Sequence, residues 1–128
     1  RIVFTKNTLE LIKSSPFFGV GTGDYPVEYK KVNQANTPTS RDTVHPHNMY
    51  LYVQSQLGIV GLISFFWIFY SQFNFALKSK DEFVKHVGVS LPLLFLVIMW
   101  SDSYLLGHYT SLLFVFFSSF LYKDFEKS

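Results

Sequence analysis

The segment His45-Pro46-His47-Asn48 brings two imidazoles and a carboxamide together, and the run Gly58-Ile59-Val60-Gly61 follows after nine residues. An imidazole near its ordinary pKa of about 6.5 can accept a hydroxyl proton at neutral pH, so the histidines are candidate general bases. The stretch from Met49 to Leu77 contains no charged side chain, and its latter part is long enough to cross the roughly 30 Å hydrocarbon layer of a membrane. We therefore expect chemistry at a membrane surface.

Two other interpretations of these histidines stay open. They can be polar residues at the start of a helix, with the Asn48 side chain capping its first turn. They can also be metal ligands, because alternate positions of an extended chain place both imidazoles on one face, where Asp42 or Glu28 would add a carboxylate. Neither carboxylate has a spacing that is diagnostic of a metal site, so we predict none.

A general base needs a substrate that other groups hold in place. The cations available for an anionic substrate are Arg1, Arg41, Lys30 and Lys31. Arginine stays charged and presents a rigid fork that matches phosphate oxygens, which favours Arg1 and Arg41 as substrate-binding residues. The two lysines are more simply explained as part of a solvated loop.

Two further groups of residues have simpler structural explanations. Gly19, Gly21 and Gly23 resemble a phosphate-binding loop only loosely, because no Lys-Ser or Lys-Thr pair follows them, and they are predicted to form a turn. Asp102 and His108 are ionisable groups next to apolar segments, but they are predicted to lie close to the membrane interface, where water solvates them.

The composition places all these residues in a membrane protein. Of 128 residues, 48% are hydrophobic and 20% aromatic, which is more than the core of a soluble domain of this size needs. The net charge of +2 with dispersed basic residues argues against nucleic acid, and the lack of cysteine excludes a disulfide framework and cysteine-ligated zinc. Because the chain begins with Arg1 and shows no signal sequence, we interpret it as the C-terminal piece of a longer protein.

Residues 1–48 are predicted to form an outer loop region with one short amphipathic helix. The helix covers residues 1–15, ends at Pro16 and has a face formed by Ile2, Thr5, Leu9 and Ile12. Glycines between residues 17 and 26 favour turns, and the mostly polar residues 29–43 favour a mobile loop.

Residues 49–128 are predicted to form the membrane region. Three transmembrane helices are expected at about residues 57–77, 86–102 and 105–122. A lysine-rich connector follows the first span, and a tight turn near residues 102–108 joins the other two. Lysines occur in the connector and the tail but not in that turn, so the positive-inside rule places the connector and tail in the cytoplasm and residues 1–48 on the outer face.

Three features of the chain together resemble one known family. An arginine, Arg1, opens a helix that ends in Pro-Phe-Phe-Gly-Val-Gly-Thr-Gly; His47-Asn48 is followed after nine residues by Gly-x-x-Gly; and the chain ends in an apolar hairpin. In this order they resemble the C-terminal region of the O-antigen ligase and polymerase superfamily, bacterial inner-membrane proteins that transfer polyprenyl-diphosphate-linked glycans. Leu62 follows Gly61 where some ligases have Thr-Pro, so ligase and polymerase both stay open.

The resemblance implies an all-α membrane protein, part of a larger multi-span GT-C-like bundle, whose active site faces the periplasm. It implies a metal-independent inverting glycosyltransferase without a cofactor. Such an enzyme moves a glycan from undecaprenyl diphosphate to an acceptor such as the lipid A core, in lipopolysaccharide or surface polysaccharide biosynthesis. His47 then corresponds to the catalytic base and Arg1 to the arginine that binds the diphosphate, while a second family arginine would lie upstream. We expect His45, Asn48 and Arg41 to contact the substrate as well.

Other functions remain open. Within the superfamily, the chain can be an O-antigen polymerase or a protein O-oligosaccharyltransferase. In a different class, it can be a non-catalytic sugar-binding membrane or transport segment, or a membrane metal hydrolase that uses His45 and His47. Transporters usually place polar residues at mid-bilayer, whereas the predicted spans have almost none there, which disfavours transport.

Overall fold

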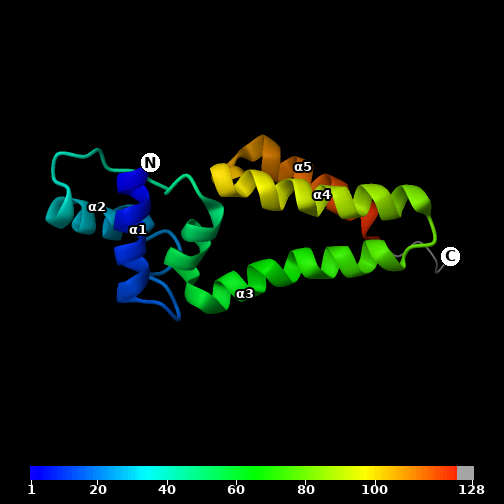
Figure 1. Cartoon of the computed structure of the whole chain (residues 1–128), viewed down its shortest axis with the longest axis horizontal. Coiled ribbons are helices and arrows are strands. Elements are labelled where there is room, and N and C mark those ends of the chain that lie inside the picture. The colour runs from blue at the N-terminus through cyan, green and yellow to red at the C-terminus, as the bar shows by residue number, and fades with distance from the viewer. Residues whose placement is uncertain (124–128) are drawn as a thin grey trace.

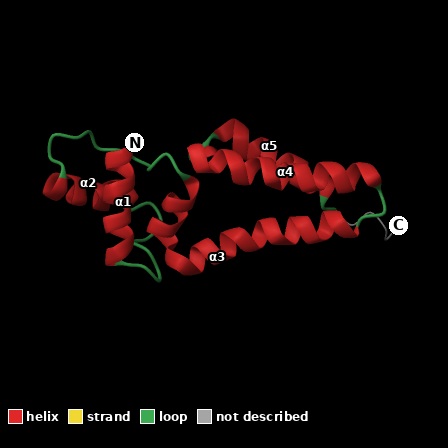
Figure 2. Ribbon diagram, viewed as in Figure 1, coloured by secondary structure: helices red, strands yellow, loops and turns green. Residues whose placement is uncertain are grey.

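The computed structural model describes residues 1–123, which form helices and loops with no strand among them. The α-helices are α1 (Ile2–Ser14), α2 (Tyr25–Asn36), α3 (Met49–Lys78), α4 (Glu82–Ser101) and α5 (His108–Leu121), and a 3-10 turn, η1 (Tyr104–Leu106), precedes α5. Figure 1 shows α1 and α2 at one end of the molecule and α4 and α5 alongside the long part of α3. Figure 2 shows that loops alone join the helices. The predicted all-α class is confirmed.

The predicted mobile loop over residues 29–43 is wrong for its first part, because α2 extends to Asn36. Pro26 is compatible with this helix because it lies in the first turn, where a backbone N–H has no helical partner in any case. The buried face of α2 consists of Tyr25, Tyr29 and Asn33. The polar composition hid this face, since the buried Asn33 amide is fully hydrogen bonded, to Asn7, Thr37, Ser40 and Asp42.

Helix α1 covers nearly the predicted residues, but its buried face is not the predicted one. Of the four residues expected there, Ile12 is buried and Thr5 half-buried, whereas Leu9 and Ile2 are exposed. The side chains that face α2 include Asn7 and Thr8, and Thr8 Oγ1 lies 2.7 Å from the hydroxyl of Tyr25. Hydrophobic spacing misplaced the face because hydrogen-bonded polar groups fill much of this contact.

Helix α3 is interrupted at Gly58, which has φ 63° and ψ −163°, so the first turns lie at an angle to the long remainder (Figure 1). A break in a helix leaves backbone groups without helical partners. Here the turn that follows α1 supplies partners, with hydrogen bonds from Val20 N to Ser55 O (2.9 Å), Gly21 N to Gln56 O (3.0 Å), Ile59 N to Pro16 O (2.9 Å) and Val60 N to Phe17 O (3.5 Å). We call this contact the glycine joint.

The predicted turn in the glycine-rich segment is confirmed, and its backbone pairs with the break in α3. Gly19, Gly21 and Gly23 all have positive φ, a region that glycine enters at little cost. At Gly19 a Cβ atom would overlap the backbone of Gln56, and at Gly58 it would overlap the backbone of Phe17. The two glycines therefore allow two backbones to meet with no side chain between them.

Helices α3 and α4 are each long and apolar enough to cross a membrane. Helix α3 begins at Met49 rather than near residue 57, and the break at Gly58 lies where the first span was predicted to start. Helix α4 begins at Glu82 rather than near residue 86, because Asp81 accepts the backbone N–H groups of Phe83 and Val84 and caps the helix. Both helices are thus longer than the predicted spans.

Helix α5 covers only part of the third predicted span, residues 105–122. It has 14 residues, about 21 Å at roughly 1.5 Å per residue, against a hydrocarbon thickness of about 30 Å. The turn predicted near residues 102–108 is present and contains η1.

The antiparallel packing of α3 and α4 positions the residues that could carry chemistry. The Tyr50 hydroxyl, in the first turn of α3, donates to the carbonyl of Leu96 near the end of α4. Buried apolar side chains, among them Phe69, Phe95 and Met99, fill the space between these helices and α5. The start of α3 therefore lies beside the end of α4.

Candidate functional site

The loop before α3 holds both histidines in a defined arrangement. His47 has φ 54°, an uncommon conformation for a residue with a side chain. Its ring lies 4.4 Å from the ring of His45, measured between centroids, and stacks on Phe4 of α1 at 5.9 Å. Backbone and ring contacts therefore fix the two imidazoles against each other and against α1.

Both imidazoles face the carboxylate of Asp102, which directly follows α4. The Nδ1 atom of His47 lies 3.2 Å from Asp102 Oδ1, and the Nδ1 atom of His45 lies 3.9 Å from it. Partial burial raises the pKa of Asp102. Hydrogen bonds from the Ser103 N–H and His47, together with the nearby imidazoles, lower this pKa by a larger amount. The net pKa lies below the usual value of an aspartate, so the carboxylate is ionised at neutral pH. We call His45, His47 and Asp102 the His–Asp cluster.

Hydrogen bonding gives the two histidines different roles. Burial and the neighbouring His47 lower the pKa of His45, outweighing the opposite effect of Asp102, so this ring is neutral at neutral pH. Its Nδ1 atom accepts the backbone N–H of His47 at 3.4 Å, which leaves its proton on Nε2. In neutral His47 the Nδ1 proton is donated to Asp102, so Nε2 carries the lone pair. His47 can accept a proton through Nε2, whereas His45 can donate a hydrogen bond through Nε2.

A cavity of about 540 Å³ adjoins His47 and contains Arg1 and Asn48 in its lining. Thr5 and Leu9, two residues of the predicted face of α1, also line it. A guanidinium and an imidazole therefore border the same space. We call it the Arg1 cavity.

The predicted capping role of Asn48 is confirmed, and its side chain makes a second contact. Its Oδ1 atom accepts the backbone N–H of Leu51 at 3.1 Å, and its Nδ2 atom donates to the Trp100 carbonyl at 3.0 Å. The same side chain therefore starts α3 and ties it to the end of α4.

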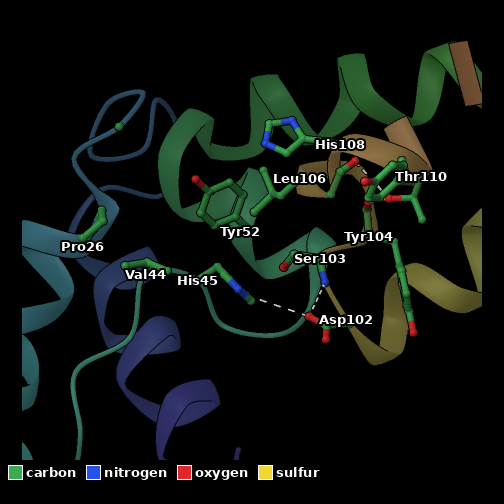
Figure 3. Close-up of a pocket in the computed structure, with 13 residues that line it drawn as sticks. Pro26, Val44, His45, Tyr52, Asp102, Ser103, Tyr104, Leu106, His108 and Thr110 are labelled. Carbon is green, nitrogen blue, oxygen red and sulfur yellow. Dashed lines mark hydrogen bonds and ion pairs between the residues drawn. The ribbon is translucent and has the colours of Figure 1, made fainter. Parts of the chain in front are cut away.

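A second cavity, of about 660 Å³, borders the cluster through His45 and Asp102 (Figure 3). Its lining also includes Tyr52 of α3, Ser103, and residues of η1 and of the start of α5. We call it the Ser103 cavity. The His–Asp cluster belongs to the walls of both spaces, because His47 lines one and its two partners line the other.

The structure brings together four of the five predicted site residues, Arg1, His45, His47 and Asn48. The fifth, Arg41, lies exposed in the loop between α2 and α3 and lines neither cavity. Asp102 was expected only to be solvated near the interface; its side chain is 34% exposed, but it also lies beside both histidines. The available signal was that Asp102 lies in the predicted turn between the last two spans, on the same membrane side as the histidines.

The possible metal ligands also differ from those considered in the sequence. Asp42 accepts a hydrogen bond from Asn33 at 2.9 Å, and Glu28 pairs with Lys31 at 2.5 Å. One potential donor atom from each member of the His–Asp cluster lies within 4.8 Å of the others. Two imidazoles and a carboxylate match the donors that zinc accepts, so this cluster, rather than Asp42 or Glu28, is the group to test for a metal.

Residues 1–66 match a known protein family. The family model described as O-antigen ligase matches residues 1–66, which is more than half of the chain. No curated protein and no solved structure matches the chain. The matched region contains Arg1, both histidines, Asn48 and the glycine joint, whereas Asp102 lies beyond it. The chain therefore belongs to the O-antigen ligase family.

Proposed function

We propose that the chain acts as an inner-membrane glycosyltransferase that moves a glycan from undecaprenyl diphosphate to a hydroxyl group of an acceptor sugar. The observation that carries this proposal is the 3.2 Å contact between His47 and Asp102 beside a cavity that Arg1 also lines. Family membership supports a lipid-linked glycan donor and an acceptor in general. The finer proposal is the ligase reaction, with the lipid A core as acceptor; an O-antigen polymerase or a protein O-oligosaccharyltransferase would use the same chemistry.

The proposed reaction needs a base, a held donor and no redox partner. Nε2 of His47 takes the proton from the acceptor hydroxyl, and the oxygen attacks the anomeric carbon of the donor sugar. The bond from that carbon to the diphosphate oxygen breaks, and the diphosphate leaves with the electron pair. Because the acceptor oxygen attacks the face opposite the leaving group in a single displacement, the configuration inverts. Asp102 holds the ring and stabilises the imidazolium that forms, while Arg1 offsets the charge that develops on the diphosphate. Arg1 supplies the positive charge here, and we propose that the reaction is metal-independent.

The diphosphate-binding role of Arg1 is tested by Arg1→Lys, which keeps the charge but removes the bidentate fork. Charge-assisted hydrogen bonds contribute enough that we expect glycan transfer to fall about 10- to 100-fold. Arg41→Lys makes the same change at an arginine that lines neither cavity, and it should have a smaller effect. Transfer to acceptor would be measured in membranes that contain equal amounts of each variant. Wild-type turnover in Arg1→Lys would remove Arg1 from the site.

We also propose that residues 1–48 form a periplasmic catalytic region and residues 49–128 a membrane region. The lysine-rich connector between α3 and α4 would then face the cytoplasm, as would the tail, of which residues 124–128 lie outside the described part. Fusions of paired periplasmic and cytoplasmic reporters at Gln34 and Ser79 test this. A reporter that works only in the periplasm should be active at Gln34, and one that works only in the cytoplasm should be active at Ser79. The opposite pattern would contradict a periplasmic site.

A further inference from the structure

The Ser103 cavity contains a polar group with no partner. Ser103 is 5% exposed, and its Oγ atom has no hydrogen-bond partner within residues 1–123. A buried hydroxyl without a partner is costly and uncommon in folded proteins, so it calls for an explanation, such as a ligand that supplies the missing hydrogen bond. Figure 3 shows this side chain among the residues that line the cavity, together with His45 and Tyr52.

The chemistry of the lining separates the two cavities. The Arg1 cavity contains a guanidinium, whereas no lysine or arginine occurs among the described residues that line the Ser103 cavity. The latter instead has the ionised Asp102, hydroxyl groups and several aromatic rings, including those of Tyr52 and Tyr104. This set repels a diphosphate and suits a neutral ligand with many hydroxyl groups and apolar C–H faces. A volume of about 660 Å³ is within the usual range for small-ligand pockets, about 300–1,000 Å³.

We propose that the Ser103 cavity binds the terminal sugar of the acceptor, while the Arg1 cavity binds the donor diphosphate. This inference rests on the proposed function and assigns its two substrates to separate spaces. Ser103 Oγ and the Nε2–H group of His45 each hydrogen bond to a sugar hydroxyl. The His45 ring lies 4.4 Å from that of His47 between centroids, and the His–Asp cluster belongs to the walls of both cavities, so the proposal places a hydroxyl held by His45 near the base. Ser103 and His45 are positioning residues in this scheme.

Binding measurements on the full protein in detergent test the assignment without requiring turnover. The first probes are methyl glycosides of glucose, galactose and N-acetylglucosamine, whose binding is measured by saturation-transfer NMR. The second probe is undecaprenyl diphosphate. We expect Ser103→Ala to weaken binding of at least one glycoside about 2- to 10-fold, the effect of one lost neutral hydrogen bond, with undecaprenyl diphosphate affinity unchanged. Arg1→Lys should have the reverse pattern. Ser119→Ala is the matched control, because the Ser119 hydroxyl bonds within its own helix, to Phe116.

Two checks separate ligand binding from a structural role. Ser103→Ala removes an unpartnered buried group, so its melting temperature should equal or exceed that of the wild type. If this variant is less stable, His108→Ala replaces it, since the exposed His108 side chain lines the same cavity, and it should also weaken glycoside binding. Glycoside affinity unchanged in both variants, or reduced undecaprenyl diphosphate affinity instead, would overturn the assignment. Loss of the proposed catalytic function would be recognised separately, as glycan transfer that survives His47→Ala.

Discussion

Replacement of His47 by alanine should reduce glycan transfer by about 10² to 10⁴, the usual contribution of a positioned general base. The imidazole is part-exposed and belongs to the loop before α3 rather than to a buried core cluster, so membrane insertion and protein abundance should stay near normal. Transfer of labelled glycan would be measured in purified membranes, with protein amount determined by immunoblotting. Full activity in His47→Ala would leave this segment a helix cap without a catalytic role.

Two companion variants distinguish a general base from a metal site. Asp102→Asn keeps the size of the side chain but removes the charged acceptor of the Nδ1 hydrogen bond. We expect glycan transfer to fall about 10- to 100-fold, similar to the effect of removing a carboxylate that orients a metal-bound histidine. His45→Ala should be milder, because His45 donates a hydrogen bond and does not take the proton. In a metal site, all three replacements would abolish activity alike, and chelator would remove activity that zinc restores. Glycan transfer that resists chelator and falls by different amounts in the three variants supports the general-base role of His47.

The parts of the fold that the sequence predicts are those set by local backbone chemistry. Glycine adopts positive φ readily, so alternating glycines predict a turn, and long uncharged apolar runs predict helices. The turn after α1 and the helices α3 and α4 were therefore predictable. Helix α2 was not, because its buried face is made of Tyr25, Tyr29 and Asn33, which read as polar in a hydropathy pattern. Their hydrogen bonds to α1 become visible only when both helices are placed.

The site residues also fall into those that the sequence predicts and those that only the fold reveals. The two histidines and Asn48 were identifiable because they are close together in the sequence. Asp102 is 55 residues from His47, and only the antiparallel packing of α3 and α4 brings them together. Arg41 shows the converse, since a suitable residue type in a suitable region lines neither cavity. Residue type limits what a group can do, whereas tertiary contacts decide whether it belongs to the site.

Replacement of Gly58 by alanine should disrupt the fold severely, although it adds a single methyl group. The backbone at Gly58, φ 63° and ψ −163°, lies in a region essentially restricted to glycine, which costs other residues of order 1–3 kcal/mol. A Cβ atom there would also overlap the Phe17 backbone. Separating the joint would break four backbone hydrogen bonds, each worth about 0.5–1.5 kcal/mol. Since domains are stable by only about 5–15 kcal/mol, we expect low abundance and rapid proteolysis.

Two other glycines distinguish overlap from backbone strain alone. Gly19→Ala would place its Cβ against Gln56 across the same joint, so it should match Gly58→Ala. Gly23 also has positive φ, but a Cβ there would meet nothing within 4 Å, so Gly23→Ala should cause only the smaller loss due to strain. Melting temperature and protease resistance would be compared for the three variants in detergent. If Gly58→Ala were as stable as Gly23→Ala, the overlap of its Cβ with the Phe17 backbone would not destabilise the fold, and the close backbone contact at the joint would be contradicted.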